Sequence, residues 1–409
     1  MSLNATPSGE RIHIAFFGCR NAGKSSLINA VTGQELSVVS DIAGTTTDPV
    51  YKAMELLPLG PCMMIDTPGF DDRGELGELR VKRTRQVLNK TDIAVLVADA
   101  ATGITDTDKE LLRLFKEKEL THIIAYNKSD LLTAIPEAGD GEIYVSAKTG
   151  YNINELRLLL GRFAPKEEDS PICRDLVSAG DIAVLVAPID SAAPKGRLIL
   201  PQQQTIRDLL DAGASALVLK DDTLKSGLEK LAAPPKMVIT DSQVFPKAAD
   251  ATPEEVPLTS FSILMARHKG FLETAVLGVT AIERLCDGDT VLVAEGCTHH
   301  RQCEDIGTVK IPGWLREYTG KELKIESTGG GSFPDDLSPY SLVIHCGGCM
   351  LSSREVKYRM KCSVDAGVPF TNYGTAIAYL NGILERSLSV FPELLGKYRE
   401  MKERNSAER

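Results

Sequence analysis

The first 165 residues predict a doubly wound α/β fold on a mostly parallel sheet. Short apolar runs of strand character (IHIAFFG, CMMID, IAVLVAD, HIIAYN and IYVS) alternate with segments of helical periodicity between residues 11 and 165. A glycine-rich loop follows the first run and leads directly into a helical segment. Strands that alternate with helices in this way form parallel sheets that helices cover on both faces.

The rest of the chain predicts two further α/β domains. The charged stretch at residues 164–171 carries two prolines and indicates a linker. After it, the strand-like runs IAVLVAPI, SALVLK and KMVIT alternate with helical segments. A polar segment from Lys247 to Pro257 separates them from a last set of strand-like runs, TVLVAE, LKIES, SLVIHC and VPFTN. We therefore expect a first domain at 1–165, a small α/β domain at 166–255 and a third α/β domain at 256–409.

Composition restricts the partners and the compartment of this 409-residue chain. Its formal net charge of -10 argues against a nucleic-acid partner, since binding to a phosphate backbone needs a concentrated basic field. The apolar runs are far shorter than the ~20 residues of a membrane helix. The N-terminus lacks the pattern of a secretory signal, so we expect a cytoplasmic protein. Nine cysteines are then expected to be reduced, and a Cys-x-x-Cys pair indicates metal or redox chemistry.

The glycine-rich loop has the spacing of a phosphate-binding loop. It runs from Gly18 to Ser25 as GCRNAGKS, between a strand and a helix, which is the context that this motif requires. Its backbone N–H groups can wrap phosphates at a helix N-terminus, Lys24 can neutralise charge on the β- and γ-phosphates, and the Ser25 hydroxyl suits Mg²⁺. The predicted phosphate-binding residues are Gly18, Asn21, Ala22, Gly23, Lys24, Ser25 and Ser26.

Three further motifs follow later strands in the order expected for a guanine-nucleotide site. DTPG places Asp66 where it can hold Mg²⁺ through water and Gly69 where its N–H can reach the γ-phosphate. NKSD places Asp130 where its carboxylate can accept N–H bonds that guanine offers and adenine does not. The sequence therefore predicts a GTP site, with these further residues on the base side: Asn127, Lys128, Asp130, Ser146, Ala147 and Lys148.

Residues 10–165 resemble translation-factor-type GTPases, and within them the TrmE/Era-type branch. The resemblance implies that Asn21 binds K⁺ beside the phosphates and that Thr46 binds Mg²⁺ and takes part in catalysis. Thr47 stands where that branch commonly has arginine, and Phe70 stands where Ras-like enzymes place a water-orienting glutamine. Some relatives carry a glutamate at the position of Glu78 that helps to place the attacking water. A solvated acidic residue is the alternative interpretation of Glu78.

A second constellation combines cysteine and histidine. Cys297 and His299 follow the run TVLVAEG, whereas His345, Cys346 and Cys349 follow SLVI. If the two strands are parallel in one sheet, the loops after them meet at the same edge, where α/β folds build ligand sites. Downstream, Ser352 and Glu355 predict a capping box for a helix through Arg359, whose N-terminus would favour thiolates.

Three interpretations of this constellation remain open from the residues alone. The cysteines could be small packing residues, although their paired spacing with histidine argues against it. A structural zinc ion would be satisfied by Cys₃His or Cys₂His₂ ligands. An iron–sulfur cluster with three cysteine ligands would leave one iron open to exchange. Cys303 and His300 are alternative ligands close to the first pair.

The order of a K⁺-type GTPase domain, a small α/β domain and the pattern CxH, x45, HCxxC resembles the FeFe-hydrogenase maturation GTPases across essentially the whole chain. This implies a 4Fe-4S cluster on Cys297, Cys346 and Cys349, with His299 as a candidate fourth ligand. It also implies a homodimer formed by the middle domain. Such a carrier receives a di-iron precursor made with two radical-SAM maturases and delivers it to apo-hydrogenase.

Two other functions remain alternatives. The first is an Era/TrmE-like ribosome or tRNA assembly GTPase with a structural zinc site, against which the acidic charge argues. The second is a redox-sensing GTPase in which Cys346 and Cys349 cycle as a dithiol.

Overall fold

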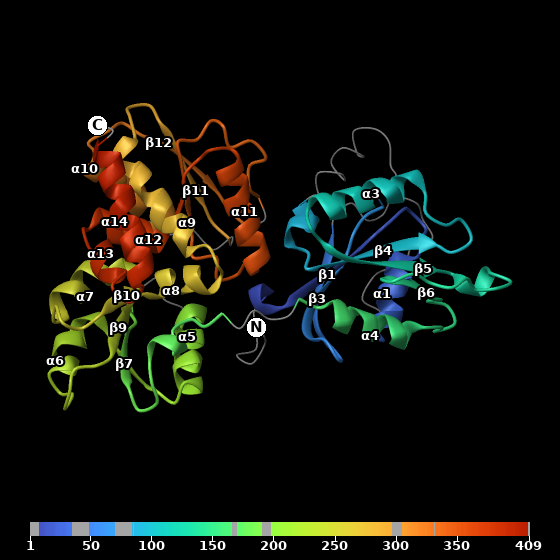
Figure 1. Cartoon of the computed structure of the whole chain (residues 1–409), viewed down its shortest axis with the longest axis horizontal. Coiled ribbons are helices and arrows are strands. Elements are labelled where there is room, and N and C mark those ends of the chain that lie inside the picture. Colours follow the sequence, from blue (N-terminus) through green and yellow to red (C-terminus); the bar gives the residue numbers. More distant parts are fainter. Residues whose placement is uncertain are drawn as a thin grey trace. The chain divides into compact units, whose positions relative to one another are not determined.

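The chain is described here from a computed structural model, and it forms two compact units, Met1–Glu167 and Glu168–Arg409. Figure 1 shows the helices and strands of each unit along the chain. The structure describes residues 8–34, 49–69, 84, 86–165, 170–189, 198–296, 305–330 and 332–407.

The first unit is the predicted doubly wound domain. Its six-stranded sheet has the order β2-β3-β1-β4-β5-β6, in which only the β2–β3 pair is antiparallel. β2 is a strand that the apolar pattern did not predict, since most of its side chains are exposed. The strands are β1 (Ile12–Phe17), β2 (Val50–Leu56), β3 (Gly60–Asp66), β4 (Ile93–Asp99), β5 (Thr121–Asn127) and β6 (Glu142–Tyr144).

Helices cover both faces of this sheet (Figure 1). α1 (Lys24–Thr32) and α4 (Ile153–Phe163) pack Leu27 and Leu156 against one face, whereas α3 (Asp106–Glu117) packs Phe115 against the other. Alternate residues of β1 enter the two cores, because successive side chains of a strand point to opposite faces. Two short 3₁₀ helices, Ser8–Glu10 and Ser129–Leu131, also belong to this unit, and residues 86–90 are helical.

The second unit contains two four-stranded parallel sheets. The first has the order β10-β9-β7-β8 and the second the order β12-β11-β13-β14. The strands of the first sheet are β7 (Ile182–Val186), β8 (Ser215–Leu219), β9 (Met237–Thr240) and β10 (Leu258–Ser260). Those of the second are β11 (Thr290–Ala294), β12 (Lys324–Thr328), β13 (Leu342–His345) and β14 (Phe370–Asn372).

The helices of the second unit alternate with these strands. α11 begins after Ser352, whose hydroxyl accepts from the Glu355 N–H at 3.3 Å, and continues to Asp365, beyond the Arg359 end that the sequence predicted. The α-helices are α5 (Leu200–Asp211), α6 (Leu224–Leu228), α7 (Phe245–Ala251), α8 (Phe261–His268), α9 (Leu272–Gly278), α10 (Ile311–Thr319), α11 (Ser353–Asp365), α12 (Tyr373–Leu380), α13 (Leu384–Ser387) and α14 (Pro392–Ala407). Shorter helical turns lie at Arg174–Leu176, Asp221–Thr223, Ser242–Val244, Val279–Arg284 and Ile306–Lys310.

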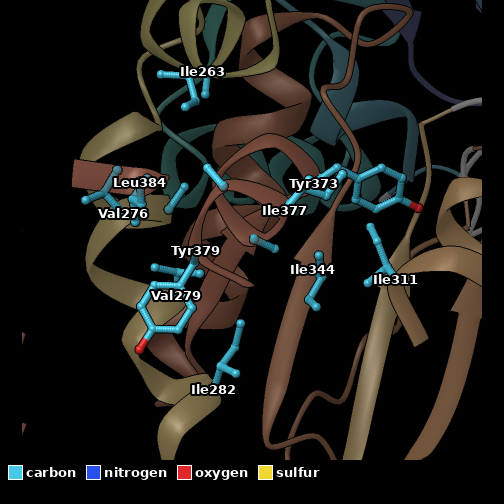
Figure 2. Close-up of a cluster of buried hydrophobic side chains, with 14 of the residues drawn as sticks. Ile263, Val276, Val279, Ile282, Ile311, Ile344, Tyr373, Ile377, Tyr379 and Leu384 are labelled. Carbon is cyan, nitrogen blue, oxygen red and sulfur yellow. The ribbon is translucent and has the colours of Figure 1, made fainter. Parts of the chain in front are cut away.

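One hydrophobic core joins the two sheets of the second unit. It contains Val238 of β9 and Ile344 of β13, with Ile263, Val276 and Ile377 from the helices α8, α9 and α12. Figure 2 shows part of this cluster, with Ile263, Val276 and Ile377 of these helices drawn together with Ile344 of β13. A shared core explains why residues from 168 onward behave as one compact unit. No helix in the described part of the chain is long and apolar enough to cross a membrane.

Candidate nucleotide site and cysteine site

The phosphate loop between β1 and α1 is closely packed against its neighbours. Gly18 has φ +138, and a Cβ there would lie 2.2 Å from the Val97 carbonyl oxygen. Gly23 has φ +89 and precedes α1, and a Cβ there would lie 2.3 Å from the Asn127 amide nitrogen. Both positions therefore require glycine. Asn21 takes the left-handed conformation with φ 61, which asparagine tolerates better than most residues, and its side chain is exposed.

The loop encloses Lys24 and brings Ser25 to the end of β3. Lys24 is buried, and its Nζ donates to the carbonyls of Gly18 at 2.9 Å and Cys19 at 2.8 Å. The Ser25 hydroxyl donates to Oδ2 of Asp66 at 2.6 Å. The hydroxyl and the carboxylate predicted for Mg²⁺ are thus in direct contact, and the lysine predicted for phosphate precedes Ser25 in the same loop. Of the other predicted residues, Ala22 is buried, whereas Ser26 on α1 and Gly69 after β3 are half-buried.

The base side is organised by Asn127 at the end of β5. Its Nδ2 donates to the Ala22 carbonyl at 3.1 Å, and its Oδ1 accepts from the Ala147 N–H at 3.1 Å. The buried Ser146 hydroxyl donates to Oδ1 of Asp130 at 2.6 Å, which orients an exposed carboxylate for a base edge. Lys148 is exposed.

Asp99 is a residue of this site that the motifs did not identify. It ends β4, and its Oδ2 accepts from Nζ of Lys128 at 2.8 Å. This hydrogen bond, above all, holds the pKa of the Asp99 carboxyl below its ordinary value. The backbone of Lys128 takes the left-handed conformation with φ 64. Asp99 additionally fixes the position of the Lys128 ammonium group. The only signal in the sequence was an acidic residue at the end of an apolar strand.

Several predicted residues of the nucleotide site lie outside the described residues. They are Thr46 and Glu78, together with Thr47 and Phe70. Their roles remain proposals.

The two strands before the cysteine clusters are parallel neighbours, which is the condition under which the loops after them meet at one edge. β11 pairs with β13, with Ala294 opposite His345, so the loops after both strands leave the same edge of the sheet. The Cys346 N–H donates to the Ala294 carbonyl at 2.8 Å. Gly296 is the last described residue before Cys297, and its N–H donates to the Cys346 Sγ at 3.1 Å. Cys297 and His299 lie outside the described residues, as do Cys303 and His300.

The Cys346 sulfur accepts hydrogen bonds from two backbone N–H groups. The second comes from Gly348 at 3.3 Å. Burial raises the pKa of the Cys346 thiol, and these two N–H groups offset part of that effect. Among the described residues, no group of three or more His, Cys, Asp and Glu side chains could hold a metal ion. Backbone N–H groups directed at a cysteine sulfur nevertheless fit a thiolate ligand, since they stabilise negative charge on sulfur.

His345 is not available as a ligand in this arrangement. It is fully buried, its Nδ1 lies 2.7 Å from the Cys346 carbonyl oxygen, and its Nε2 lies 3.4 Å from Nη1 of Arg359. Burial, followed by the charge of Arg359 and more weakly that of Lys269, lowers the pKa of His345 to about 3. The neutral ring therefore donates from Nδ1 to the carbonyl and accepts from the guanidinium at Nε2.

Arg359 holds the two strand ends together. Its buried guanidinium donates to Oε1 of Glu355 at 2.6 Å and to the carbonyls of Gly330 at 2.6 Å and Glu295 at 3.4 Å. It thereby links Glu295, two positions before Cys297, to His345, which directly precedes Cys346.

The strand–loop–helix around Gly23 and the guanine-side contacts define the first unit as a P-loop GTPase domain. A family model described as "50S ribosome-binding GTPase" matches residues 13–128. Models described as "Hydrogen maturase F dimerization domain" and "Hydrogen maturase F tetramerization domain" match residues 172–270 and 273–390. These two matches together span more than half of the chain. The chain belongs to the hydrogen maturase F family, the GTPases of hydrogenase maturation, which confirms the predicted resemblance.

Curated relatives match the GTPase part. The tRNA modification GTPase MnmE of Nitrosospira multiformis is 34% identical over 155 residues, covering 36% of this chain and 34% of that relative. GTPase Der of Wolinella succinogenes is 40% identical over 123 residues, covering 29% of this chain and 26% of that relative. The chain thus spans about a third or less of the length of these relatives. Among solved structures, the crystal structure of Era in complex with MgGDPNP and 16S ribosomal RNA nucleotides has 19% identity and a TM-score of 0.34, covering 51% of this chain and 92% of that one.

Both maturase models describe oligomerisation domains, so the second unit contains the segments through which the chain oligomerises. A dimerisation segment agrees with the predicted self-association, and the tetramerisation segment adds a second one.

Proposed function

We propose that the chain is a K⁺-stimulated GTPase that binds a 4Fe-4S cluster, carries a di-iron precursor and delivers it to apo FeFe-hydrogenase. The observation that carries this proposal is the match of residues 172–270 and 273–390 to hydrogen maturase F. The partners are the hydrogenase and the two radical-SAM maturases. The net charge of -10 supports protein partners over nucleic acid.

In the GTPase domain, Lys24 and the loop N–H groups bind the β- and γ-phosphates of GTP. Ser25 ligates Mg²⁺, Asp66 holds it through water, and Thr46 completes its ligands. Asn21, which is exposed on the loop, would bind K⁺ beside the phosphates, where the ion would stabilise charge in the transition state. Glu78 positions the attacking water, and hydrolysis yields GDP and phosphate.

In the third domain, Cys297, Cys346 and Cys349 hold the cluster, and His299 is the candidate fourth ligand. When bound, such a cluster supplies one iron that can take an additional group. The chain's own residues stabilise the thiolate charge through the N–H groups of Gly296 and Gly348. His345 and Arg359 orient the loops without ligating. The division into domains at 1–165, 166–255 and 256–409 remains part of this proposal.

Anaerobic reconstitution tests the metal half. The wild-type chain should become brown, with iron and sulfide bound and broad absorption near ~400 nm, as iron–sulfur clusters give. Cys346→Ala should lose most of the bound iron, whereas Cys286→Ala, an exposed cysteine outside both loops, should keep it. Colourless protein that contains only zinc would overturn the cluster and leave a GTPase with a structural metal, as in the Era/TrmE-like alternative.

A further inference from the structure

Lys269 is a buried lysine at the end of α8 that reaches the cysteine loop. Only 4% of its surface is exposed. Its Nζ donates to the carbonyl of Gly348 at 2.5 Å and to the carbonyl of Leu351 at 2.7 Å. Lys269 lies within the segment that matches the dimerisation domain, and the loop lies within the segment that matches the tetramerisation domain. The dimerisation segment thus supplies the ammonium of Lys269 to the cysteine loop of the tetramerisation segment.

The two carbonyls that Lys269 binds belong to one tight turn. The Leu351 N–H donates to the Gly348 carbonyl at 3.0 Å, which closes a four-residue turn with Cys349 and Met350 at its centre. Gly348 has φ +62, and a Cβ there would lie 2.9 Å from a methyl carbon of Val356. The ammonium therefore holds both ends of the turn that carries Cys349.

The same contact orients the second cysteine. Gly348 accepts from Lys269 through its carbonyl and donates through its N–H to the Cys346 Sγ at 3.3 Å. Displacement of the Gly348 carbonyl would tilt the adjoining peptide groups and weaken this N–H···S bond. A buried ammonium is also unfavourable unless hydrogen bonds and nearby negative charge offset its loss of water. Thiolates on this loop would provide such charge, and the ammonium would in turn favour the thiolates.

We propose that Lys269 is a positioning residue of the cysteine site, which fixes Cys346 and Cys349 through the Gly348–Leu351 turn and offsets the negative charge of a bound thiolate–metal centre. This inference rests on the proposed function, because it requires that the cysteines bind metal. It assigns to the middle segment of the chain a part in the metal site in addition to oligomerisation.

The test compares Co²⁺ binding by the reduced, metal-free full chain in the wild type and in Lys269→Met. Binding is followed by thiolate-to-cobalt absorption in competition with a chelator. Loss of such an outer-shell partner is expected to weaken metal affinity about 10- to 100-fold. Lys361→Met, which removes an exposed positive charge from α11, should bind Co²⁺ as the wild type does. Equal Co²⁺ affinity in the wild type and in folded Lys269→Met would overturn the inference.

Two further measurements separate positioning from general destabilisation. Lys269→Gln keeps a donor for one carbonyl, so it should fold where Met does not and should show an intermediate loss of Co²⁺ affinity. In reconstituted protein, both variants should lower the reduction potential of the cluster, because a positive charge that favours the reduced state is gone. An unchanged potential would overturn the electrostatic role. Failure of Cys346→Ala to reduce Co²⁺ binding would instead overturn the proposed function together with this inference.

Discussion

The side-chain amide of Asn127 donates to the carbonyl of Ala22 at 3.1 Å, across 105 positions of sequence. Its oxygen accepts from Ala147. One buried side chain thus links the phosphate loop to the loop expected behind the base.

Asn127→Ala should weaken GDP and GTP binding alike, by about 10- to 100-fold for two buried hydrogen bonds. Fluorescent-nucleotide titration measures this, and Asn154→Ala, exposed on α4, should bind as the wild type does. Equal affinities for Asn127→Ala and the wild type would contradict the link.

Asp99→Asn should weaken nucleotide binding only modestly. The Asp99–Lys128 pair is partly exposed, so its loss should reduce binding by about 1 kcal/mol or less. The hydrogen bond from Lys128 lowers the pKa of Asp99 below its ordinary value of 3.8. The contribution of the carboxylate to binding is therefore complete at pH values above 3.8 and is lost as the pH falls through the lowered pKa. The affinity difference between wild type and Asp99→Asn should therefore stay constant from pH 5 to pH 8. A difference that changes across this range would show that Asp99 does not act as a carboxylate paired with Lys128.

Gly18→Ala should abolish tight nucleotide binding. The new Cβ would lie 2.2 Å from the backbone oxygen of Val97, so β4 or the phosphate loop must move. Gly103→Ala is the matched control, since Gly103 has φ +73 but nothing within 4 Å of its Cβ position. That variant should lose about 1–2 kcal/mol of stability from the left-handed conformation while it still binds GDP. Calorimetric titration with GDP separates the two outcomes, and tight binding by Gly18→Ala would show that the loop can relax.

The sequence predicted the site best where a motif depends on the local backbone around it. The glycines of the phosphate loop, Asn127 and Asp130 could be identified because each motif needs a fixed local spacing after a strand. The two apolar runs that precede the cysteines indicated the strands β11 and β13, whereas their parallel pairing was only a condition that the structure satisfies. These features depend on local geometry and on the general rule for ligand sites at sheet edges.

The residues that support the sites could not be predicted in the same way. Lys269 follows the last residue of α8 and Arg359 lies on α11, and a charged residue at such a position usually indicates exposure to solvent, yet both side chains are buried. Both also donate to backbone carbonyls far away in sequence, which carry no residue-specific signal. β2 was missed for the opposite reason, because its exposed side chains lack an apolar pattern although its backbone pairs with β3. Tertiary packing decided each of these cases.

K⁺ should accelerate GTP hydrolysis if Asn21 binds the ion. The rate should be clearly higher in KCl than in NaCl at equal ionic strength, because only an ion of suitable size fits beside the phosphates to stabilise the transition state. Asn21→Ala should remove this difference while GDP affinity is largely kept. Phosphate release measured in both salts tests the effect. Equal wild-type rates in KCl and NaCl would eliminate the K⁺ site without affecting GTP binding.

Arg359→Met should destabilise the second unit strongly. It would leave the Glu355 carboxylate buried without the guanidinium and remove donors from Gly330 and Glu295. Loss of one partner of a buried pair is expected to lower the free energy of unfolding by about 3–5 kcal/mol. The unfolding transition of this unit in urea measures the change, with Lys361→Met on the same helix as the exposed control.

The double variant Arg359→Met, Glu355→Leu separates the cost of a buried unpaired charge from the loss of the hydrogen bonds to the backbone carbonyls. Replacement of both buried charges by apolar side chains removes the unpaired carboxylate, so this variant should regain part of the stability that Arg359→Met loses. Its remaining deficit would report the carbonyls of Gly330 and Glu295, which still lack their donor. If Arg359→Met instead unfolded like Lys361→Met, the guanidinium would not be what holds the ends of β11 and β13 together. His345 would then need another donor at Nε2 to keep its place beside Cys346.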